Sequence, residues 1–430
     1  MAVGSAEVGA IVPAVFAALK GMPDLVSPET DRRRALVDTF ATAAGRAGYA
    51  EVQSPLLEDL GVFLRVGEAT DVVTKEMYDF VDKDGTRIAL RPEFTASLMR
   101  MFVEHPPATL PWKVWTTGPA FRHENPQAGR YRQFFQLDLE AVGAADPDVD
   151  VEVIAVAHDF FRSLGLTQVS LKLNSLGDES SREPFMAALR AHFDANRDGL
   201  SEQSRITLEK NPLRVLDSKR DYDQAVIEAA PRMTDFLKPH TAAHFERVQQ
   251  GLRAVGIAFT LESRLVRGLD YYTHTLFEFG ADALVSSQNA IGGGGHYDNL
   301  VEQLGGPSTP GIGFGLGIDR ILLACDAEGV FGAPPRMVAV FVVDTTGGSS
   351  AVALTHELRR AGIGAERSFD GRSMKAQFKA ADRSGAAIAL VVGSNEEADG
   401  TVVVRDLRAS DQVVVPRSDV LAEVQRRLTR

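Results

Sequence analysis

Residues 121–140, FRHENPQAGRYRQFFQLDLE, carry a dense set of side chains that could bind a charged ligand. Three arginines, Arg122, Arg130 and Arg132, come first. Three hydrogen-bonding residues at every second position follow them: Gln136, Asp138 and Glu140. Residues two apart share one face of an extended strand, so the last three would lie on one face. Guanidinium groups bind phosphates and carboxylates through paired hydrogen bonds. The pattern predicts two strands joined by a basic loop, with one polar face.

A simple alternative for this segment is an amphipathic hairpin whose solvent face happens to be charged. Two features argue against it. The arginines cluster at the turn, and Phe134 and Phe135 are both apolar where a half-buried strand would alternate. We therefore interpret the segment as a candidate binding site.

Two further stretches hold candidate ligand-binding groups. Residues 91–95, RPEFT, open a predicted helix, where Glu93 and Thr95 could bind a ligand. They could equally be a first-turn carboxylate and a helix cap. Residues 265–279, LVRGLDYYTHTLFEF, place Arg267 before a predicted strand with alternating residues. An ion pair between Arg267 and Asp270 that stabilises the strand start is the alternative there.

Two glycine-rich stretches, IGGGGHYDNLVEQLGG and GIGFGLGIDRI, invite a phosphate-loop or dinucleotide-site interpretation. Neither is followed by Lys-Ser or Lys-Thr. No βαβ unit with an acidic residue about 20 positions further on surrounds them. We therefore interpret them as strands, the second of which leads into a helix with Arg320 in its first turn.

The composition bounds the class of protein. The 430 residues, 44% hydrophobic and 24% charged, suit two or three globular domains. No apolar run reaches the length of about 18 residues that a membrane span needs, and the apolar residues 11–19 lack a preceding basic residue. One cysteine, Cys325, excludes an internal disulfide and a cysteine-based zinc site. We expect a cytoplasmic protein without membrane contact.

The net charge of −12 is unusual for a nucleic-acid binder, but it is uneven along the chain. From residue 336 onward there are 14 basic and 12 acidic residues, a net charge of +2, which leaves −14 for the rest. RNA contact by this last part is permitted but not required. Its Arg372, Lys375 and Lys379 are spaced along one expected helix face, either as an RNA contact or as a solvated stripe.

Proline and glycine positions and the periodicity of apolar residues predict the helices and strands that would position these groups. Pro28 near a start and Gly48 after an end delimit the first helix, and Pro55 puts the next strand at an edge or interface. Beyond Pro334, strands and helices alternate, which predicts a small α/β domain. The other expected elements are a helix over 28–47, a strand over 50–58, a hairpin turn at 83–85, a helix over 151–164, a strand over 169–174 and a helical block over 175–254.

Residues 121–140 resemble motif 2 of the class II aminoacyl-tRNA synthetases, and specifically of the histidyl-tRNA synthetase family. RGLDYYT at 267–273 resembles a signature of that one family, and RPEFT at 91–95 resembles its RPExT-like element. Residues 21–60 resemble motif 1 of the class II enzymes, and GIGFGLGIDRI resembles motif 3. The resemblance covers about residues 20–415. It implies an α+β catalytic domain with a central antiparallel sheet flanked by helices, a helical insertion and a C-terminal α/β anticodon-binding domain. The implied boundaries are 1–174 and 255–333 for the catalytic domain, 175–254 for the insertion and 336–430 for the last domain.

The resemblance also implies a reaction. The enzyme would activate L-histidine with ATP, assisted by Mg²⁺, and transfer it to the 3′ end of tRNA(His), as a homodimer formed through motif 1. The implied catalytic residues are Arg267 and Arg122, and the implied ATP-binding residues are Arg122, Arg130 and Arg320. The metal ligands are not assigned. The implied histidine-binding residues are Glu93, Thr95, Arg122, Gln136, Glu140, Arg267, Tyr271, Tyr272 and Tyr297.

The sequence departs from the family pattern at five positions, Phe94, Asn125, Phe135, His296 and Asp319, where Gly, Arg, His, Arg and Glu are usual. One alternative function is the regulatory subunit of ATP phosphoribosyltransferase, a non-catalytic paralogue. That subunit lacks the C-terminal domain and loses the RGLDYY block, whereas this chain has both. Another class II synthetase with the same C-terminal domain is disfavoured by residues 267–273.

Overall fold

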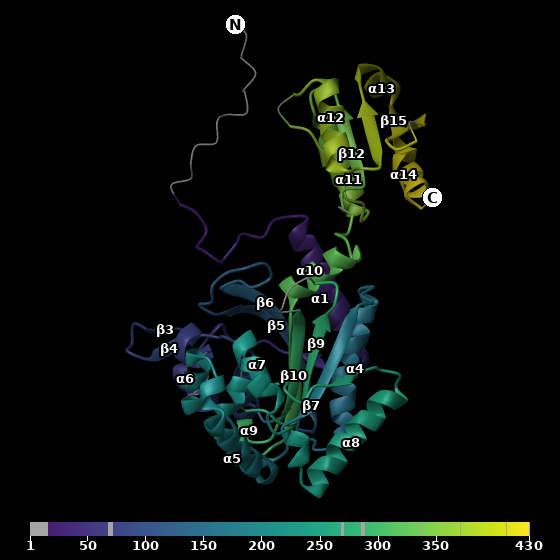
Figure 1. Ribbon diagram of the computed structural model, residues 1–430. Coiled ribbons are helices and arrows are strands. Elements are labelled where there is room, and N and C mark those ends of the chain that lie inside the picture. Colours follow the sequence, from purple (N-terminus) through teal and green to yellow (C-terminus); the bar gives the residue numbers. More distant parts are fainter. Residues whose placement is uncertain are drawn as a thin grey trace. The chain divides into compact units, whose positions relative to one another are not determined.

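The computed structural model describes residues 16–67, 72–267, 271–284, 289–335, 337–369, 371–409 and 411–429. The chain forms two compact units, Met1–Ala333 and Pro334–Arg430, each with its own sheet (Figure 1). Within the described residues, no helix is long and apolar enough to cross a membrane.

An eight-stranded sheet forms the centre of the first unit, in the order β1-β5-β6-β11-β10-β9-β7-β8. Its six inner strands pair antiparallel, whereas β1 and β8, two residues each, pair in parallel at the two edges. The predicted antiparallel sheet is therefore confirmed in its interior. In sheet order the strands span Ala50–Glu51, Trp112–Phe121, Gln133–Val142, Gly311–Gly317, Ala290–Tyr297, Thr273–Ala281, Val169–Ser175 and Thr260–Leu261.

Four helices cover one face of this sheet: α1 (Glu29–Arg46), α4 (Pro147–Ser163), α8 (Pro239–Ala254) and α10 (Ile318–Glu328). The sheet presents alternate apolar residues to them, such as Leu137 and Leu139 of β6 and Phe277 of β9. Phe40 of α1 packs edge-on against Phe160 of α4, with ring centroids 5.1 Å apart. The predicted helices over 28–47 and 151–164 correspond to α1 and α4.

The opposite face of the sheet is partly covered by smaller elements. They are α2 (Leu60–Gly67), α3 (Thr95–Glu104), α9 (Leu300–Gln303) and a three-stranded sheet of β2 (Leu57–Asp59), β4 (Arg87–Leu90) and β3 (Tyr78–Val81). The single strand predicted over 50–58 is wrong. It is split into β1 and β2, with Pro55 between them, and each piece lies at the edge of a different sheet.

The segment between β7 and β8 is helical, as predicted, with α5 (Glu179–Ala195), α6 (Glu202–Lys210) and α7 (Asp221–Glu228) preceding α8. The first three form a separate apolar core around Phe185, Leu189 and Phe193. In contrast, α8 packs beside α4 and contributes Phe245 to the core of the sheet (Figure 1).

The second unit is an α/β domain with a five-stranded sheet in the order β13-β12-β14-β15-β16. The helix carrying Lys375 and Lys379 begins at Met374, so the prediction that Arg372 shares its face is wrong. In sheet order the strands span Ala365–Arg367, Val340–Asp344, Ile388–Val392, Thr401–Asp406 and Gln412–Pro416. The helices are α11 (Ser349–Arg360), α12 (Met374–Ser384), α13 (Ser394–Asp399) and α14 (Val420–Leu428).

Candidate active site

A buried carboxylate, Glu140 of β6, lies at the centre of the face opposite the four helices. The Thr95 hydroxyl donates to its Oε1 at 2.6 Å, and the Tyr297 hydroxyl donates to its Oε2 at 2.6 Å. Burial raises the pKa of Glu140 to about 7, although both hydrogen bonds favour the ionised form. The carboxylate is therefore held in one orientation, in surroundings that favour a positively charged or N–H-donating partner.

Glycines in β11 make room for the polar face of β6. Gly313, Gly315 and Gly317 lie opposite Glu140, Asp138 and Gln136 in the strand pairing. A Cβ on Gly313 would lie 1.8 Å from Glu140 Oε2, and one on Gly315 would lie 2.3 Å from Gln136 Nε2. Gly313 and Gly315 are thus explained by side chains that lie across them, and the predicted common face of the three polar residues is confirmed.

The segment before α3 supplies two further groups. Glu93 is buried and accepts from the Ala96 N–H at 2.9 Å. Burial raises the pKa of Glu93, although the hydrogen bond from Ala96 and the charge of Arg122 oppose this shift. The helix begins at Thr95, whose hydroxyl turns to Glu140 instead of capping the helix. Glu93 therefore does bond the helix start, whereas the capping interpretation of Thr95 is wrong.

Three tyrosines lie beside Glu140. The rings of Tyr271 and Tyr272 are 4.6 Å apart, and those of Tyr271 and Tyr297 are 5.8 Å apart, measured between centroids. All three are buried, and burial raises their pKa values, that of Tyr272 to about 12. Their hydroxyls therefore stay protonated and can donate hydrogen bonds.

Arg267 lies next to this group. Its Nη1 is 2.9 Å from Glu278 Oε2 of β9, and its guanidinium carbon would be 3.1 Å from a Cβ on Gly293 of β10. The guanidinium thus lies over the glycine strands on the same face as Glu140. The alternative partner, Asp270, lies outside the described residues.

The remaining predicted arginines gather towards the Gln136 end of the sheet. Arg122 donates from Nε to the Pro92 carbonyl at 2.9 Å and lies over the Phe134 ring. Arg320 donates to the Ala290 carbonyl. Its pKa is lowered by burial and then by the charge of Arg130, whose Nη1 is 3.4 Å from Glu124. Cations that destabilise each other in this way favour a bound anion.

Three of the departures from the family pattern have clear packing partners. Phe94 lies against the Arg91 guanidinium, 4.0 Å from its central carbon to the ring centroid. Asp319 pairs with Arg33 of α1 and accepts from the Phe135 N–H at 3.4 Å. These residues therefore hold α1, the strand that carries Phe135, and α10 together. Asn125 is exposed in the loop between β5 and β6.

The fifth departure, His296, is buried on the helix side of the sheet. Its Nδ1 lies 3.1 Å from Asp150 Oδ1, and its Nε2 lies 3.2 Å from Asp298 Oδ1. Burial opposes the charged imidazole, but these two contacts outweigh it and raise the pKa of His296 to about 9. A cationic group is thereby retained where the family usually has Arg.

The structure shows the surroundings of Asp138, which the sequence had placed on the polar face, and adds Glu278, which sequence reasoning missed. Asp138 is buried beside Glu140, and burial raises its pKa well above the usual value. Its alternation with Gln136 and Glu140 correctly predicted its place on that face. No local pattern in the sequence predicted that Glu278 would pair with Arg267, because this ion pair depends on how the chain before β9 folds back over that strand.

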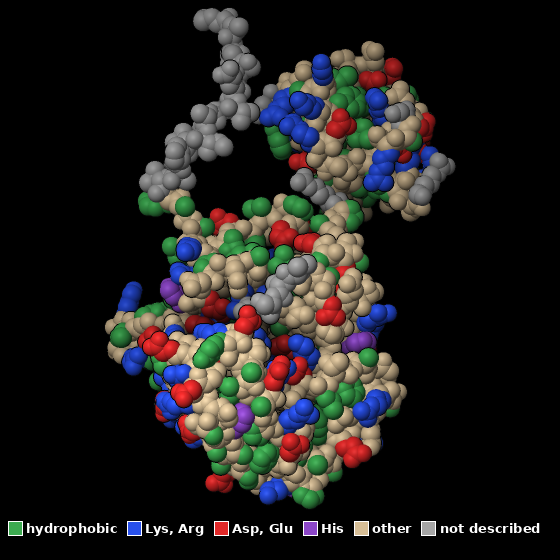
Figure 2. Space-filling model, viewed as in Figure 1, with side chains coloured by type: hydrophobic (Ala, Val, Ile, Leu, Met, Phe, Trp, Pro, Cys, Tyr) green, Lys and Arg blue, Asp and Glu red, His purple; other side chains and the backbone are tan. Residues whose placement is uncertain are grey.

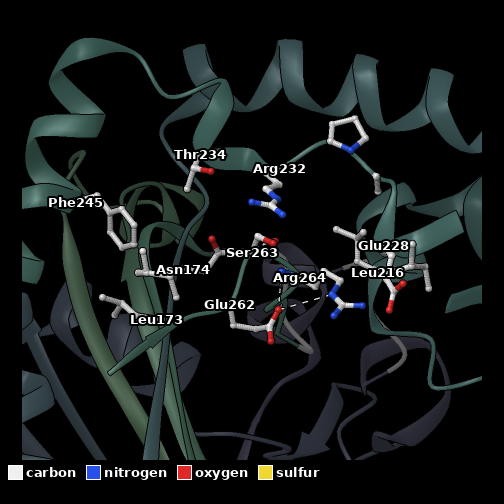
Figure 3. Close-up of a pocket in the computed structure, with 14 residues that line it drawn as sticks. Leu173, Asn174, Leu216, Glu228, Arg232, Thr234, Phe245, Glu262, Ser263 and Arg264 are labelled. Atoms are coloured by element: carbon white, nitrogen blue, oxygen red, sulfur yellow. Dashed lines mark hydrogen bonds and ion pairs between the residues drawn. The ribbon is translucent and has the colours of Figure 1, made fainter. Parts of the chain in front are cut away.

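A separate cavity of about 400 Å³ lies where the insertion meets the sheet (Figure 3). Asn174, Arg232 and Glu262 are among the residues that line it, and Arg264 lies within 3.8 Å of Glu262. None of the residues predicted for the site lines this cavity. The candidate site is instead the glycine-floored face around Glu140.

The fold and the site together define a class II aminoacyl-tRNA synthetase catalytic domain, followed by an α/β domain. A family model described as histidyl-tRNA synthetase matches residues 21–321, and one described as anticodon binding domain matches residues 337–427. The chain belongs to the histidyl-tRNA synthetase family.

Individual relatives agree with that assignment. A histidine–tRNA ligase from Rhodococcus erythropolis is 47% identical over 411 residues, covering 94% of this chain and 96% of that protein. One from Anaeromyxobacter dehalogenans is 46% identical over 410 residues, covering 94% and 98%. The crystal structure of apo histidyl-tRNA synthetase from S. aureus is similar with a TM-score of 0.81 at 33% identity, covering 95% and 99%.

Proposed function

We propose that this protein is a histidine–tRNA ligase, which activates L-histidine with ATP to histidyl-adenylate and transfers the histidyl group to the 3′ end of tRNA(His). One observation carries the specificity part of this proposal. Glu140 is buried, is held from two sides by Thr95 and Tyr297, and lies over a floor without side chains. A flat ring with an N–H donor fits such a site.

In this proposal the imidazole of histidine donates to Glu140, and Tyr272 lies at its other side. Glu93, Thr95 and Gln136 bind the α-ammonium group, while Tyr271 and Tyr297 close the pocket. A site whose buried polar groups need hydrogen bonds from the ligand rejects analogues that lack them by roughly 10⁴–10⁵.

The arginines serve the phosphate end. Arg122 would bind the α-phosphate and the histidine carboxylate, Arg130 and Arg320 the outer phosphates, and Arg267 would stabilise charge at the α-phosphorus. Arg320 and Arg130 are close enough for the charge of one to lower the pKa of the other, which supports an anion between or beside them. Arginine suits this role because it stays charged and binds oxygens in pairs.

Mg²⁺ would neutralise charge on the phosphate oxygens of ATP. Hard cations of this kind take oxygen ligands, often a carboxylate together with phosphate oxygens. Glu278 is a carboxylate that pairs with Arg267, and it is near enough to Arg320 for its charge to raise the pKa of that residue. It therefore lies among the arginines proposed to bind the phosphates. It would be the protein ligand at that end of the site.

The reaction needs no covalent intermediate with the protein. A histidine carboxylate oxygen attacks the α-phosphorus, the bond to the bridging oxygen breaks, and pyrophosphate leaves. A terminal ribose hydroxyl of the tRNA then attacks the carbonyl carbon of the adenylate, and AMP leaves. Positioning of the reactants and fixed positive charge account for catalysis of this kind.

The C-terminal unit would bind the tRNA anticodon. A cavity of about 330 Å³ on this unit is lined by Arg367, Arg372, Arg383 and the largely exposed Phe369. Figure 2 shows Lys and Arg side chains gathered on this unit. Guanidinium groups beside an exposed aromatic ring are the chemistry that binds unpaired nucleotides. The division at residues 174, 254 and 336 and a cytoplasmic location stay predictions.

We also propose a homodimer that uses the motif 1 region together with β3 of the same small sheet. Leu56, Leu57, Phe80 and Val81 lie in or next to the two edge strands of the small sheet, and each is more than 40% exposed. Apolar side chains gathered at strand edges are typical of a surface that another chain covers. An isologous contact through this region would give two active sites per dimer.

The decisive experiment is exchange of labelled pyrophosphate into ATP with each proteinogenic amino acid, without tRNA. Exchange with histidine alone would support the proposal. The variant Glu140→Ala should fold normally and lose histidine activation, whereas Glu302→Ala, an exposed carboxylate of α9, should behave as wild type. Histidine binding without any exchange would instead favour the regulatory-subunit alternative.

A further inference from the structure

Three histidines and two aspartates meet on the helix side of the sheet, behind the candidate active site. They come from five places along the chain: Asp150 of α4, His244 of α8, His274 of β9, His296 of β10 and Asp298 directly after β10. The imidazole ring centroids lie between 5.0 and 5.6 Å apart. Such a gathering is unusual in an apolar helix–sheet layer, because polar groups are costly to bury without a strong partner.

The inner members of this cluster have the arrangement of metal ligands. Asp150 lies between two imidazoles, with Oδ2 at 3.0 Å from His244 Nε2 and Oδ1 at 3.1 Å from His296 Nδ1. One ligand atom from each of the three residues lies within 4.8 Å of the others. An ion bound at about 2.0–2.2 Å from each atom would fit among them after small shifts.

Asp298 adds the outer contact that metal-bound histidines usually have. Its Oδ1 lies 3.2 Å from His296 Nε2, and its Oδ2 lies 3.4 Å from His274 Nε2. If these nitrogens carry the ring protons, His296 presents the lone pair of Nδ1 towards Asp150. Thr273 donates to Asp298 at 3.0 Å, which holds the carboxylate in place.

His274 lies beside the three ligands, but its ring nitrogens are not among the atoms that lie within 4.8 Å of one another. Its Nδ1 is buried and has no hydrogen-bond partner among the described residues. With Nε2 directed to Asp298, this nitrogen is the free acceptor of the ring. Two imidazoles with one carboxylate, as in His244, His296 and Asp150, are a donor set that Zn²⁺ prefers, because zinc takes nitrogen and oxygen ligands in a tetrahedral site.

An acidic opening leads to the cluster. A cavity of about 530 Å³ is lined by Asp178, Glu179, Glu183 and Asp298. Like charges along one cavity attract cations from solution. Asp298 is thus shared between the cavity wall and the histidine cluster, so the cavity offers an entry path for an ion.

We propose that Asp150, His244 and His296 bind one Zn²⁺ ion per chain, with Asp298 as the outer carboxylate that contacts His296 and His274. The ion would replace the proton held between Asp150 and His296. It would join α4 and α8 to β10, directly behind Tyr297, and so hold the wall of the histidine pocket. The site is structural in this proposal and takes no part in the reaction.

Metal binding to the full-length protein tests this directly. Protein stripped with chelator and titrated with Co²⁺ should take up about one ion per chain and show the visible absorption of tetrahedral Co²⁺. Asp298→Asn, which removes only the outer contact, should weaken binding by about 10- to 100-fold. His158→Ala, also on α4 but paired with Asp159 outside the cluster, is the matched control and should bind normally.

His296→Arg is the sharpest variant, because arginine can replace the cation between Asp150 and Asp298 without binding zinc. It should fold, bind no Co²⁺ and show no thermal stabilisation by Zn²⁺, whereas wild type and His158→Ala should be stabilised. Wild-type protein that binds no ion, or binds it equally well in His296→Arg, would overturn the proposal. The cluster would then be a protonated histidine between two carboxylates. This readout does not depend on histidine activation, so it is separate from the proposed function.

Discussion

The Tyr297 hydroxyl lies 2.6 Å from Glu140 Oε2, although their strands, β10 and β6, are separated by β11. The contact is possible because β11 has glycines at the crossing. A Cβ on Gly311 would lie 2.4 Å from the Tyr297 ring, and one on Gly313 would lie 1.8 Å from Glu140. Glycines in β11 therefore allow side chains of the two neighbouring strands, β6 and β10, to meet above it.

The first prediction concerns this glycine floor. Gly313→Ala should lower histidine-dependent pyrophosphate exchange by about 100-fold, because the new methyl group must displace the Glu140 carboxylate. Circular dichroism should report an intact fold. The control is Gly317→Ala on the same strand, whose Cβ would meet its nearest atom, Arg320 Cγ, at an ordinary 3.8 Å. Equal activity of the two variants would show that the position of Glu140 is unimportant.

The second prediction concerns the hydroxyl that holds Glu140. Tyr297→Phe should weaken histidine binding about tenfold, or by about 1.4 kcal/mol, because a buried carboxylate loses one of its two donors. Isothermal titration calorimetry with histidine measures this. Tyr222→Phe removes an exposed hydrogen bond in the insertion and should leave the affinity unchanged. Wild-type affinity in Tyr297→Phe would remove this tyrosine from the site.

The third prediction concerns pH. Burial raises the pKa of Glu140 from 4.5 to about 7 in the folded protein, so between these values the folded state binds more protons than the unfolded state. The contribution of Glu140 to stability is therefore present below about pH 4.5 and is lost as the pH rises through about 7.

The measurement compares thermal unfolding of wild type and Glu140→Gln without ligands, from about pH 5 to pH 8. Glutamine is neutral throughout, so the variant should become more stable relative to wild type as the pH increases. A stability difference that does not change with pH would show that Glu140 titrates normally.

The fourth prediction concerns the contact between α1 and α10. Asp319→Ala should destabilise the first unit by about 2 kcal/mol, because the largely buried Arg33 loses its buried partner and keeps only the contact with Glu29 of its own helix. Chemical denaturation followed by tryptophan fluorescence measures this, since both tryptophans lie in β5. Asp319→Glu, which restores the residue usual in the family, should lower the free energy of unfolding much less than Asp319→Ala does. Equal losses would indicate that the effect is one of packing and not of charge.

Much of the local architecture could be predicted from the sequence. The alternation of Gln136, Asp138 and Glu140 placed them on one face, because the side-chain period of a strand is two whatever lies around it. The helix predicted over 28–47 is α1 within one residue at each end, since Pro28 and Gly48 act locally. The single strand over 50–58 and the helix face with Arg372 were wrong, whereas the edge position predicted from Pro55 is confirmed.

The sequence by itself thus determined the class of fold and the family, and it predicted the residues that would bind histidine and ATP. Only the tertiary structure decided which groups meet. Glu278 reaches Arg267, and Asp150 reaches His244 and His296 from distant parts of the chain. The physical reason is that strand order and helix packing bring such groups together, and neither is encoded in the spacing of the residues concerned.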